Sequence, residues 1–144
     1  FYKRDSLADF KNNDKIRTIQ SSDFEEILEL DREVSGEDRK NILLLLVENG
    51  YAYWDKNQIK GFFLPRIGNG VIITMDDEAG IELLKFKHTN YNKMTAVPEE
   101  NTVARDFLMK NGFENYNDSL RMVLGENINW KPERIFCRIS GYLS

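Results

Sequence analysis

Apolar and polar residues alternate along this chain with two periods, one typical of strands and one typical of helices. Residues 16–20 change from apolar to polar at every second position, as in a half-buried strand. Ala79, Leu83 and Phe86 recur at helical spacing instead. The pattern predicts helices ending at Val34 and Asn49, helices over 76–87 and 102–110, and strands over 1–4, 16–20, 51–54, 59–64, 71–75, 94–97, 113–116, 120–124 and 135–139.

The middle of the chain predicts a strand–helix–strand unit formed by residues 71–75, 76–87 and 94–97. Two strands joined by a helix in this way almost always run parallel with a right-handed crossover. Residues 51–54 and 59–64 flank a polar turn and predict an antiparallel hairpin. The sequence therefore predicts a fold in which helices share one core with both parallel and antiparallel strand pairs.

The second predicted helix is apolar around more of its surface than one face requires. The run responsible is Ile42 to Val47. Two interpretations stay open: the helix is deeply buried, or its outer side is shared with a neighbouring domain or a second copy of the chain.

Size and charge restrict the class of protein. The chain has 144 residues, a formal net charge of -4, 41% hydrophobic and 31% charged residues, which is typical of one globular domain. Lys and Arg are scattered, so we expect no nucleic acid and no membrane surface as a partner. We expect a soluble, cytoplasmic protein.

Few residues offer strong chemistry. Cys137 is the only cysteine and His88 the only histidine, which excludes a zinc site of the usual type and any Cys/His or Ser/His nucleophile pair. We expect no metal site.

One segment resembles a known family. Val97-Pro98-Glu99-Glu100-Asn101-Thr102-Val103-Ala104, followed by Leu108 and Gly112-Phe113, is similar to the Asn-x-x-Ala and Gly-Phe element of the GNAT acetyltransferase superfamily. The order of predicted elements fits that superfamily. The resemblance implies an α+β fold: a GNAT-like mixed, mostly antiparallel sheet with one parallel βαβ unit and about four helices.

A second resemblance concerns the position of the domain in its parent protein. Leu30 to Arg39 and Arg138-Ile139-Ser140-Gly141 are similar to the GNAT-like domain that forms the C-terminal half of two-domain GNAT proteins. This implies that residues 1–14 are the tail of a preceding domain and a linker, and that residues 15–144 are the GNAT-like domain. The first residue is Phe1 and not Met, which agrees with a piece of a longer protein. The implied partner is a preceding GNAT domain in the parent chain.

The resemblance also implies where acetyl-CoA would bind. In the superfamily the cofactor lies between two splayed strands, with its pyrophosphate on a glycine-rich turn at a helix N-terminus. Carried over to this chain, the contacts fall on Ile73, Met75, Asp77, Asn101 and Ala104.

Two departures from the superfamily stand at this place. The turn contains Asp76, Asp77 and Glu78, whose carboxylates cap the helix themselves and repel a diphosphate. The position of the usual proton-donating tyrosine is Leu108, which has no proton to donate, and Tyr116 is a weak substitute. The catalytic residue is therefore unknown.

Three residues are candidates for binding the acceptor. Asp31 and Arg39 could hold a charged group at the edge of a cleft, or form a salt bridge between two helices. Tyr53 could line an acceptor pocket, or point into the core.

Together these features predict a domain of an acetyl-CoA-dependent N-acetyltransferase acting on a small-molecule or peptide amine. The departures favour a degenerate C-terminal half that supports substrate binding. The alternatives are an active transferase domain and a non-catalytic ligand-binding or dimerisation module, including a homodimer.

Overall fold

A computed structural model describes residues 1–91, 94–122 and 125–138 of the chain. Four α-helices and eight strands are assigned within these residues. In chain order they are β1 (Tyr2–Lys3), β2 (Ile16–Thr18), α1 (Phe24–Ser35), α2 (Lys40–Leu46), β3 (Tyr51–Asp55), β4 (Gln58–Leu64), β5 (Val71–Thr74), α3 (Asp77–Asn90), β6 (Met94–Thr95), α4 (Thr102–Lys110), β7 (Glu114–Asn115) and β8 (Ile135–Cys137), with short 3₁₀ turns η1 (Ser21–Asp23) and η2 (Pro132–Arg134). The predicted α+β class with four helices is confirmed.

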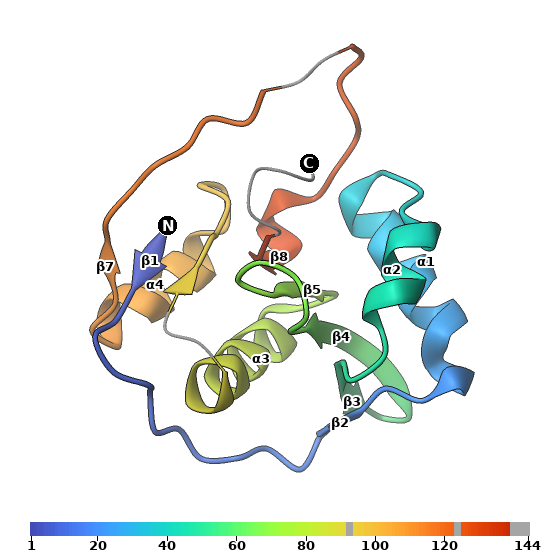
Figure 1. Cartoon of the computed structure of the whole chain (residues 1–144), viewed down its shortest axis with the longest axis horizontal. Helices are drawn as coiled ribbons and strands as arrows, with labels where there is room; N and C mark the ends of the chain where they lie inside the picture. The colour runs from blue at the N-terminus through green and yellow to red at the C-terminus, as the bar shows by residue number, and fades with distance from the viewer. Residues whose placement is uncertain (92–93, 123–124, 139–144) are drawn as a thin grey trace.

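The strands form two sheets. The larger has the order β2-β3-β4-β5-β8 and the smaller has the order β6-β1-β7, and every pair within them is antiparallel. The predicted hairpin is β3–β4, in which Asp55 pairs with Gln58 across a two-residue turn. Lys56 and Asn57 both have positive φ, as a type I′ turn requires. Figure 1 shows the small sheet beside α4 and the large sheet between α3 and the α1–α2 pair.

The strands on either side of α3 do not pair with each other. The predicted order of strand, helix and strand is present, but β5 lies in the large sheet and β6 in the small one. The C-terminal strand β8 pairs with β5, and the backbone N–H of Arg138 directly after it donates to Ala96 O at 2.8 Å. Thus β8 lies between the two strands that the sequence pattern predicts to be parallel neighbours.

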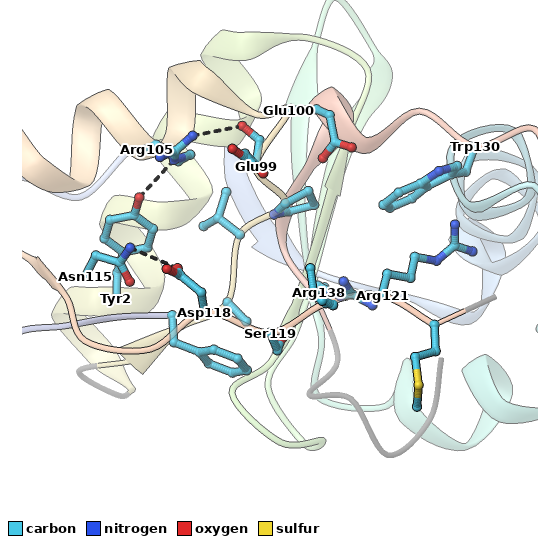
Figure 2. Close-up of a pocket in the computed structure, with 16 residues that line it drawn as sticks. Tyr2, Glu99, Glu100, Arg105, Asn115, Asp118, Ser119, Arg121, Trp130 and Arg138 are labelled. Carbon is cyan, nitrogen blue, oxygen red and sulfur yellow. Dashed lines mark hydrogen bonds between the residues drawn. The ribbon is translucent and has the colours of Figure 1, made fainter.

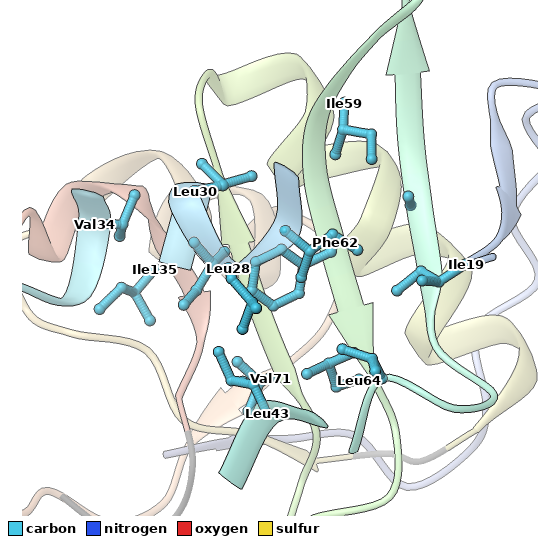
Figure 3. Packing of buried hydrophobic residues seen from close by; sticks show 14 residues of the cluster. Ile19, Leu28, Leu30, Val34, Leu43, Ile59, Phe62, Leu64, Val71 and Ile135 are labelled. Atoms are coloured by element: carbon cyan, nitrogen blue, oxygen red, sulfur yellow. The ribbon is translucent and has the colours of Figure 1, made fainter. Parts of the chain in front are cut away.

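Two hydrophobic clusters cover the faces of the large sheet. Phe62 and Phe63 are both fully buried, but as neighbours on β4 they point to opposite faces. Phe62 joins the cluster under α1 and α2 (Figure 3), and Phe63 joins the cluster under α3. Burial of each such side chain contributes roughly 1.5–3 kcal/mol to folding, so the two clusters hold the helices on the sheet.

The helix α2 is shorter than predicted, and only part of its apolar run is buried. Leu43 and the following Val47 are each 1% exposed, whereas Leu45 is 75% exposed. Ile42 and Leu44 are also partly exposed. Deep burial of the whole run is therefore wrong, because the helix lies on the surface of the domain and only one side faces the sheet.

Strand β1 lies at the centre of the small sheet. It pairs with β6 on one side and β7 on the other, and Tyr2 packs in a buried cluster with Leu108 and Phe113. The assignment of residues 1–14 to a preceding domain stays a prediction. In the structure, residues 2–3 pair with β6 and β7, two strands from the second half of the chain.

Two predicted strands at the end of the chain differ from the structure or extend beyond its described part. Residues 120–122 form no strand; residues 123–124, the rest of that predicted strand, lie outside the described residues. The predicted final strand is β8, and its predicted last residue Ile139 also lies outside them.

Replacement of Gly36 by Ala tests how α1 ends. Gly36 has φ 73° and its N–H donates to Arg32 O, and a Cβ at this position would overlap the backbone oxygen of Asn129. We expect Gly36→Ala to lower the free energy of unfolding by about 1–2 kcal/mol for the left-handed backbone, plus a further loss from the overlap. Denaturant unfolding followed by circular dichroism measures this.

Gly112→Ala is the matched control for that substitution. Gly112 ends α4 with φ 78°, but nothing lies within 4 Å of the position its Cβ would take. Equal losses for the two variants would show that the contact with Asn129 contributes nothing.

Candidate functional site

The turn between β5 and α3 is where the resemblance places a pyrophosphate, and its three carboxylates already have partners. Asp76 caps α3, accepting the N–H of Ala79 at 2.9 Å. Asp77 pairs with Arg134 of η2 at 3.0 Å. Glu78 accepts the hydroxyl of Tyr53 at 2.6 Å. The favourable electrostatics of the helix start therefore stabilise side chains of the protein itself.

Strand β8 covers the same turn from the side. Phe136 is fully buried, and its ring lies so close to Gly80 that a Cβ there would overlap it. Ile73, one of the predicted cofactor contacts, pairs with Phe62 of β4 on one side and Ile135 of β8 on the other. The backbone of β5 has no open edge at this point.

Met75 lies directly after β5. Its backbone N–H donates to Lys60 O at 2.6 Å, and its side chain is partly exposed. This predicted cofactor contact thus continues the pairing with β4.

The side chain of Asn101, in the Asn-x-x-Ala element, connects β8 to the start of α4 by hydrogen bonds. The Asn101 side chain accepts the N–H of Ala104 and donates to the carbonyl of Ile135, each at 2.9 Å. Both Asn101 and Ala104 are buried. The two remaining predicted cofactor residues therefore make hydrogen bonds within the chain.

The predicted acceptor residues lie in two separate places. Asp31 is 1% exposed on α1 and receives two hydrogen bonds from Arg39, which joins α1 to the start of α2. Tyr53 lies on the opposite face of the sheet, among the residues packed against α3. The structure does not bring Tyr53 together with Asp31 and Arg39.

Neither Leu108, at the position of the usual proton donor, nor Tyr116 lies beside the β5–α3 turn. Leu108 is fully buried against Tyr2 and Phe113. Tyr116 is 41% exposed at the far end of the small sheet, where its N–H donates to Phe1 O. The catalytic residue remains unassigned.

A large pocket that the sequence pattern did not indicate opens between the two sheets. Its volume is about 750 Å³. Five parts of the chain surround it: the start of the chain with β1, the loop after β6, Arg105 of α4, β7 with the segment after it, and the two residues Trp130 and Arg138 (Figure 2). Its lining residues are Phe1, Tyr2, Ala96, Val97, Pro98, Glu99, Glu100, Arg105, Asn115, Asp118, Ser119, Leu120, Arg121, Met122, Trp130 and Arg138.

Two arginines stand out in this pocket, which will be called the β1–β8 pocket. Arg121 lies over the Trp130 ring at 4.3 Å from its centroid. Arg138 is half-buried, and burial, followed by the positive charge of Arg121, lowers its pKa, with Glu100 opposing the shift. Burial of a guanidinium beside a like charge is unfavourable, so the pair is suited to an anion.

No group of three or more His, Cys, Asp or Glu residues capable of holding a metal ion occurs in residues 1–91, 94–122 and 125–138. Over the same residues, no helix has the length and apolar character needed to cross a membrane.

Comparison with known proteins identifies the kind of domain. A family model described as an acetyltransferase (GNAT) domain matches residues 27–137, which is more than half of the chain. No curated protein matches the sequence. One solved structure that matches is described as that of "a putative acetyltransferase" from Pyrococcus horikoshii, with 17% identity and a TM-score of 0.76. The match covers 96% of this chain and 49% of that one, so the chain spans about half the length of this structural neighbour. At this identity the likeness shows the fold alone.

Replacement of Arg39 tests whether the Asp31–Arg39 pair is structural. Arg39→Ala leaves the Asp31 carboxylate buried without its partner, and we expect a loss of about 3 kcal/mol in the free energy of unfolding. Urea unfolding measures the loss. Arg66→Ala, which removes an exposed ion pair to Glu48, is the control and should cost less than about 1 kcal/mol. Unchanged stability of Arg39→Ala would instead favour a role in substrate binding.

The hydroxyl of Tyr53 should stay protonated far above neutral pH. Burial, followed by the hydrogen bond to Glu78, raises the pKa of Tyr53 to about 12 from the ordinary 10.0. Because the folded pKa is the higher one, this contribution to stability is complete below pH 10 and is lost as the pH rises through about 12. The phenolate absorbance that Tyr53→Phe removes should therefore appear near pH 12 and not near pH 10.

Glu78→Gln gives a control for that titration. It removes the charge next to the hydroxyl, so the midpoint should move down. A midpoint near the ordinary value in the unmodified protein would contradict the buried hydrogen bond.

Proposed function

The chain belongs to the acetyltransferase (GNAT) domain family, and from this we propose that it is the half of an acetyl-CoA-dependent N-acetyltransferase that supports substrate binding. We propose further that its own acetyl-CoA site is closed. The observation that carries this proposal is the position of β8. It pairs with β5 and puts the Phe136 ring on the first turn of α3, where the family resemblance places the cofactor.

The residues at this place do not fit coenzyme A. A diphosphate needs free backbone N–H groups and a positive helix end, but Asp76 caps the helix, and Asp77 and Glu78 add negative charge beside it. A pantetheine arm needs an open strand edge, and β5 is paired on both sides. We therefore derive no catalytic step from this turn.

A complete transferase then needs a second domain that binds acetyl-CoA. We infer that a preceding GNAT domain in the parent chain supplies it, which agrees with the half-length match to the structural neighbour. In this arrangement the present domain contributes the β1–β8 pocket, which is lined by charged and apolar groups suited to holding an amine acceptor.

A second candidate function is a dimerisation module. The observation that favours it is the outer side of α2, where Ile42, Leu44 and Leu45 are exposed next to one another. A mass that rises with protein concentration in light scattering would favour this alternative.

Titration with acetyl-CoA tests whether the acetyl-CoA site at the β5–α3 turn is closed. A ligand present at 100 times its dissociation constant stabilises a protein by about 2.7 kcal/mol, which raises the melting temperature of a chain this size by several degrees. We expect no rise with 1 mM acetyl-CoA, i.e. at about 100 times a typical ~10 µM dissociation constant. Differential scanning fluorimetry measures this, and calorimetric titration should record no heat of binding.

The variant Phe136→Ala makes the test specific. It removes the ring that covers Gly80 but leaves the carboxylates at the turn, so acetyl-CoA should still not bind. Binding of acetyl-CoA by the unmodified chain would refute the proposal that its acetyl-CoA site is closed.

A further inference from the structure

The β1–β8 pocket is lined by equal numbers of positive and negative side chains that form no ion pairs in the part of the chain that the structure describes. Three arginines and three carboxylates line it, and among the described residues none of these six takes part in an ion pair within 4.0 Å. They are Arg105, Arg121, Arg138, Glu99, Glu100 and Asp118. Elsewhere in the described chain, opposite charges do form such pairs, as Arg134 and Asp77 do.

Two of these charged groups have polar partners in the pocket wall. Arg105 donates to the Tyr2 hydroxyl at 2.9 Å and to Glu99 O at 3.1 Å. Asp118 accepts a hydrogen bond from Asn115 at 3.0 Å. These groups support the wall, which leaves Arg121, Arg138, Glu99 and Glu100 to meet a ligand. Of the two carboxylates, Glu100 is the one that stands across from Arg138 (Figure 2).

Those charges lie in a defined order around the pocket. Figure 2 shows Arg138 and Arg121 on the same side, with Trp130 above Arg121 and Glu100 across from Arg138. Arg138 and Arg121 are like charges that lie as neighbours (Figure 2), and among the described residues no ion pair within 4.0 Å joins either of them to Glu100. A group that bridges the two guanidiniums must therefore be an anion, and a group that meets Glu100 must be a cation.

Apolar surface lies between the charged groups. Ala96, Val97 and Pro98 come from the loop after β6, and Trp130 presents its ring on the other side. Such surface binds a small hydrocarbon or aromatic side chain.

We propose that the β1–β8 pocket binds a small amino acid with an apolar side chain. Its carboxylate would bridge Arg121 and Arg138, its ammonium group would face Glu100, and its side chain would lie between Trp130 and Pro98. The proposal names an acceptor class for the proposed function and in that respect rests on it. Binding itself needs no acetyl transfer.

Other kinds of ligand fit this charge pattern less well. A polyanion such as a nucleotide would meet Glu99, Glu100 and Asp118, and a polyamine would meet the arginines. An amino acid satisfies both signs and adds no net charge to a balanced pocket.

Direct binding to the full chain tests the proposal. The probes are L-phenylalanine, L-leucine and L-methionine, measured by calorimetric titration and by the rise in melting temperature. We expect at least one to bind with a millimolar or lower dissociation constant. N-acetyl-L-phenylalanine lacks the ammonium group and phenethylamine lacks the carboxylate, so each should bind at least tenfold more weakly than L-phenylalanine.

Variants of the pocket locate the binding site. Arg138→Gln and Glu100→Gln should each weaken amino acid binding at least tenfold. Arg66→Gln is the matched control, because it removes an exposed guanidinium outside the pocket, and it should bind like the unmodified chain. Circular dichroism should show that all three variants are folded.

Two results would overturn the proposal. One is the absence of binding by all three amino acids at 20 mM, a concentration chosen at about ten times or more the expected dissociation constant. The other is binding that Arg138→Gln and Glu100→Gln leave unchanged.

Failure of this proposal is distinguishable from failure of the proposed function. Amino acid binding without any acetyl transfer in the parent protein would keep the pocket assignment and refute the transferase role. Acetyl transfer to amines by the parent protein, with no amino acid binding in this pocket, would keep the transferase role and refute the pocket assignment.

Discussion

The antiparallel pairing between β5 and β8 is the interaction on which the rest of the structure depends. β5 belongs to the large sheet, while Arg138, directly after β8, donates its backbone N–H to Ala96 beside the small sheet. The strand thereby connects two sheets that would otherwise share only loops and helices. Asn101 reinforces the connection, because its buried side chain holds both the start of α4 and the carbonyl of Ile135.

This pairing also determines the chemistry at the start of α3. The positive end of a helix attracts whichever negative group is closest, and here the closest groups are its own Asp76 and its neighbours. Arg134, which η2 brings to Asp77, balances part of that charge. The buried Phe136 ring packs against Gly80 in the first turn. The place that would hold a diphosphate in the family resemblance thus has acidic side chains and a β8 side chain packed against it.

The same segment forms one wall of the β1–β8 pocket. Trp130 lies before η2 and Arg138 lies after β8, so the residues that close the turn at α3 also place an aromatic ring and a guanidinium in the pocket. The segment that packs against the start of α3 therefore also bounds the concave surface of the pocket. This link between the two features supports the proposal that the domain binds the acceptor.

The local pattern of residues was sufficient to predict most of the helices and strands. The helix α1 ends one residue after the predicted Val34, and α4 ends at the predicted Lys110. Gly36 and Gly112 follow these ends with a left-handed backbone that glycine reaches readily. The β3–β4 hairpin follows from its polar turn and flanking apolar residues. The acids at the turn that the resemblance points to were predicted to cap the helix, and Asp76 does so.

Patterns of residues within a few positions of one another therefore predicted most of the helices and strands, the family resemblance and the acidic start of α3. The strand that lies beside β5 could be known only from the folded chain, because backbone hydrogen bonds carry no side-chain signature and β8 is more than 60 residues away from β5 in the sequence. The tertiary structure also decided that Asp31 and Tyr53 lie on opposite faces of the sheet, and that Arg121 and Arg138 share a pocket. Those outcomes depend on long-range packing, in which residues far apart in the chain meet only after the sheets have formed.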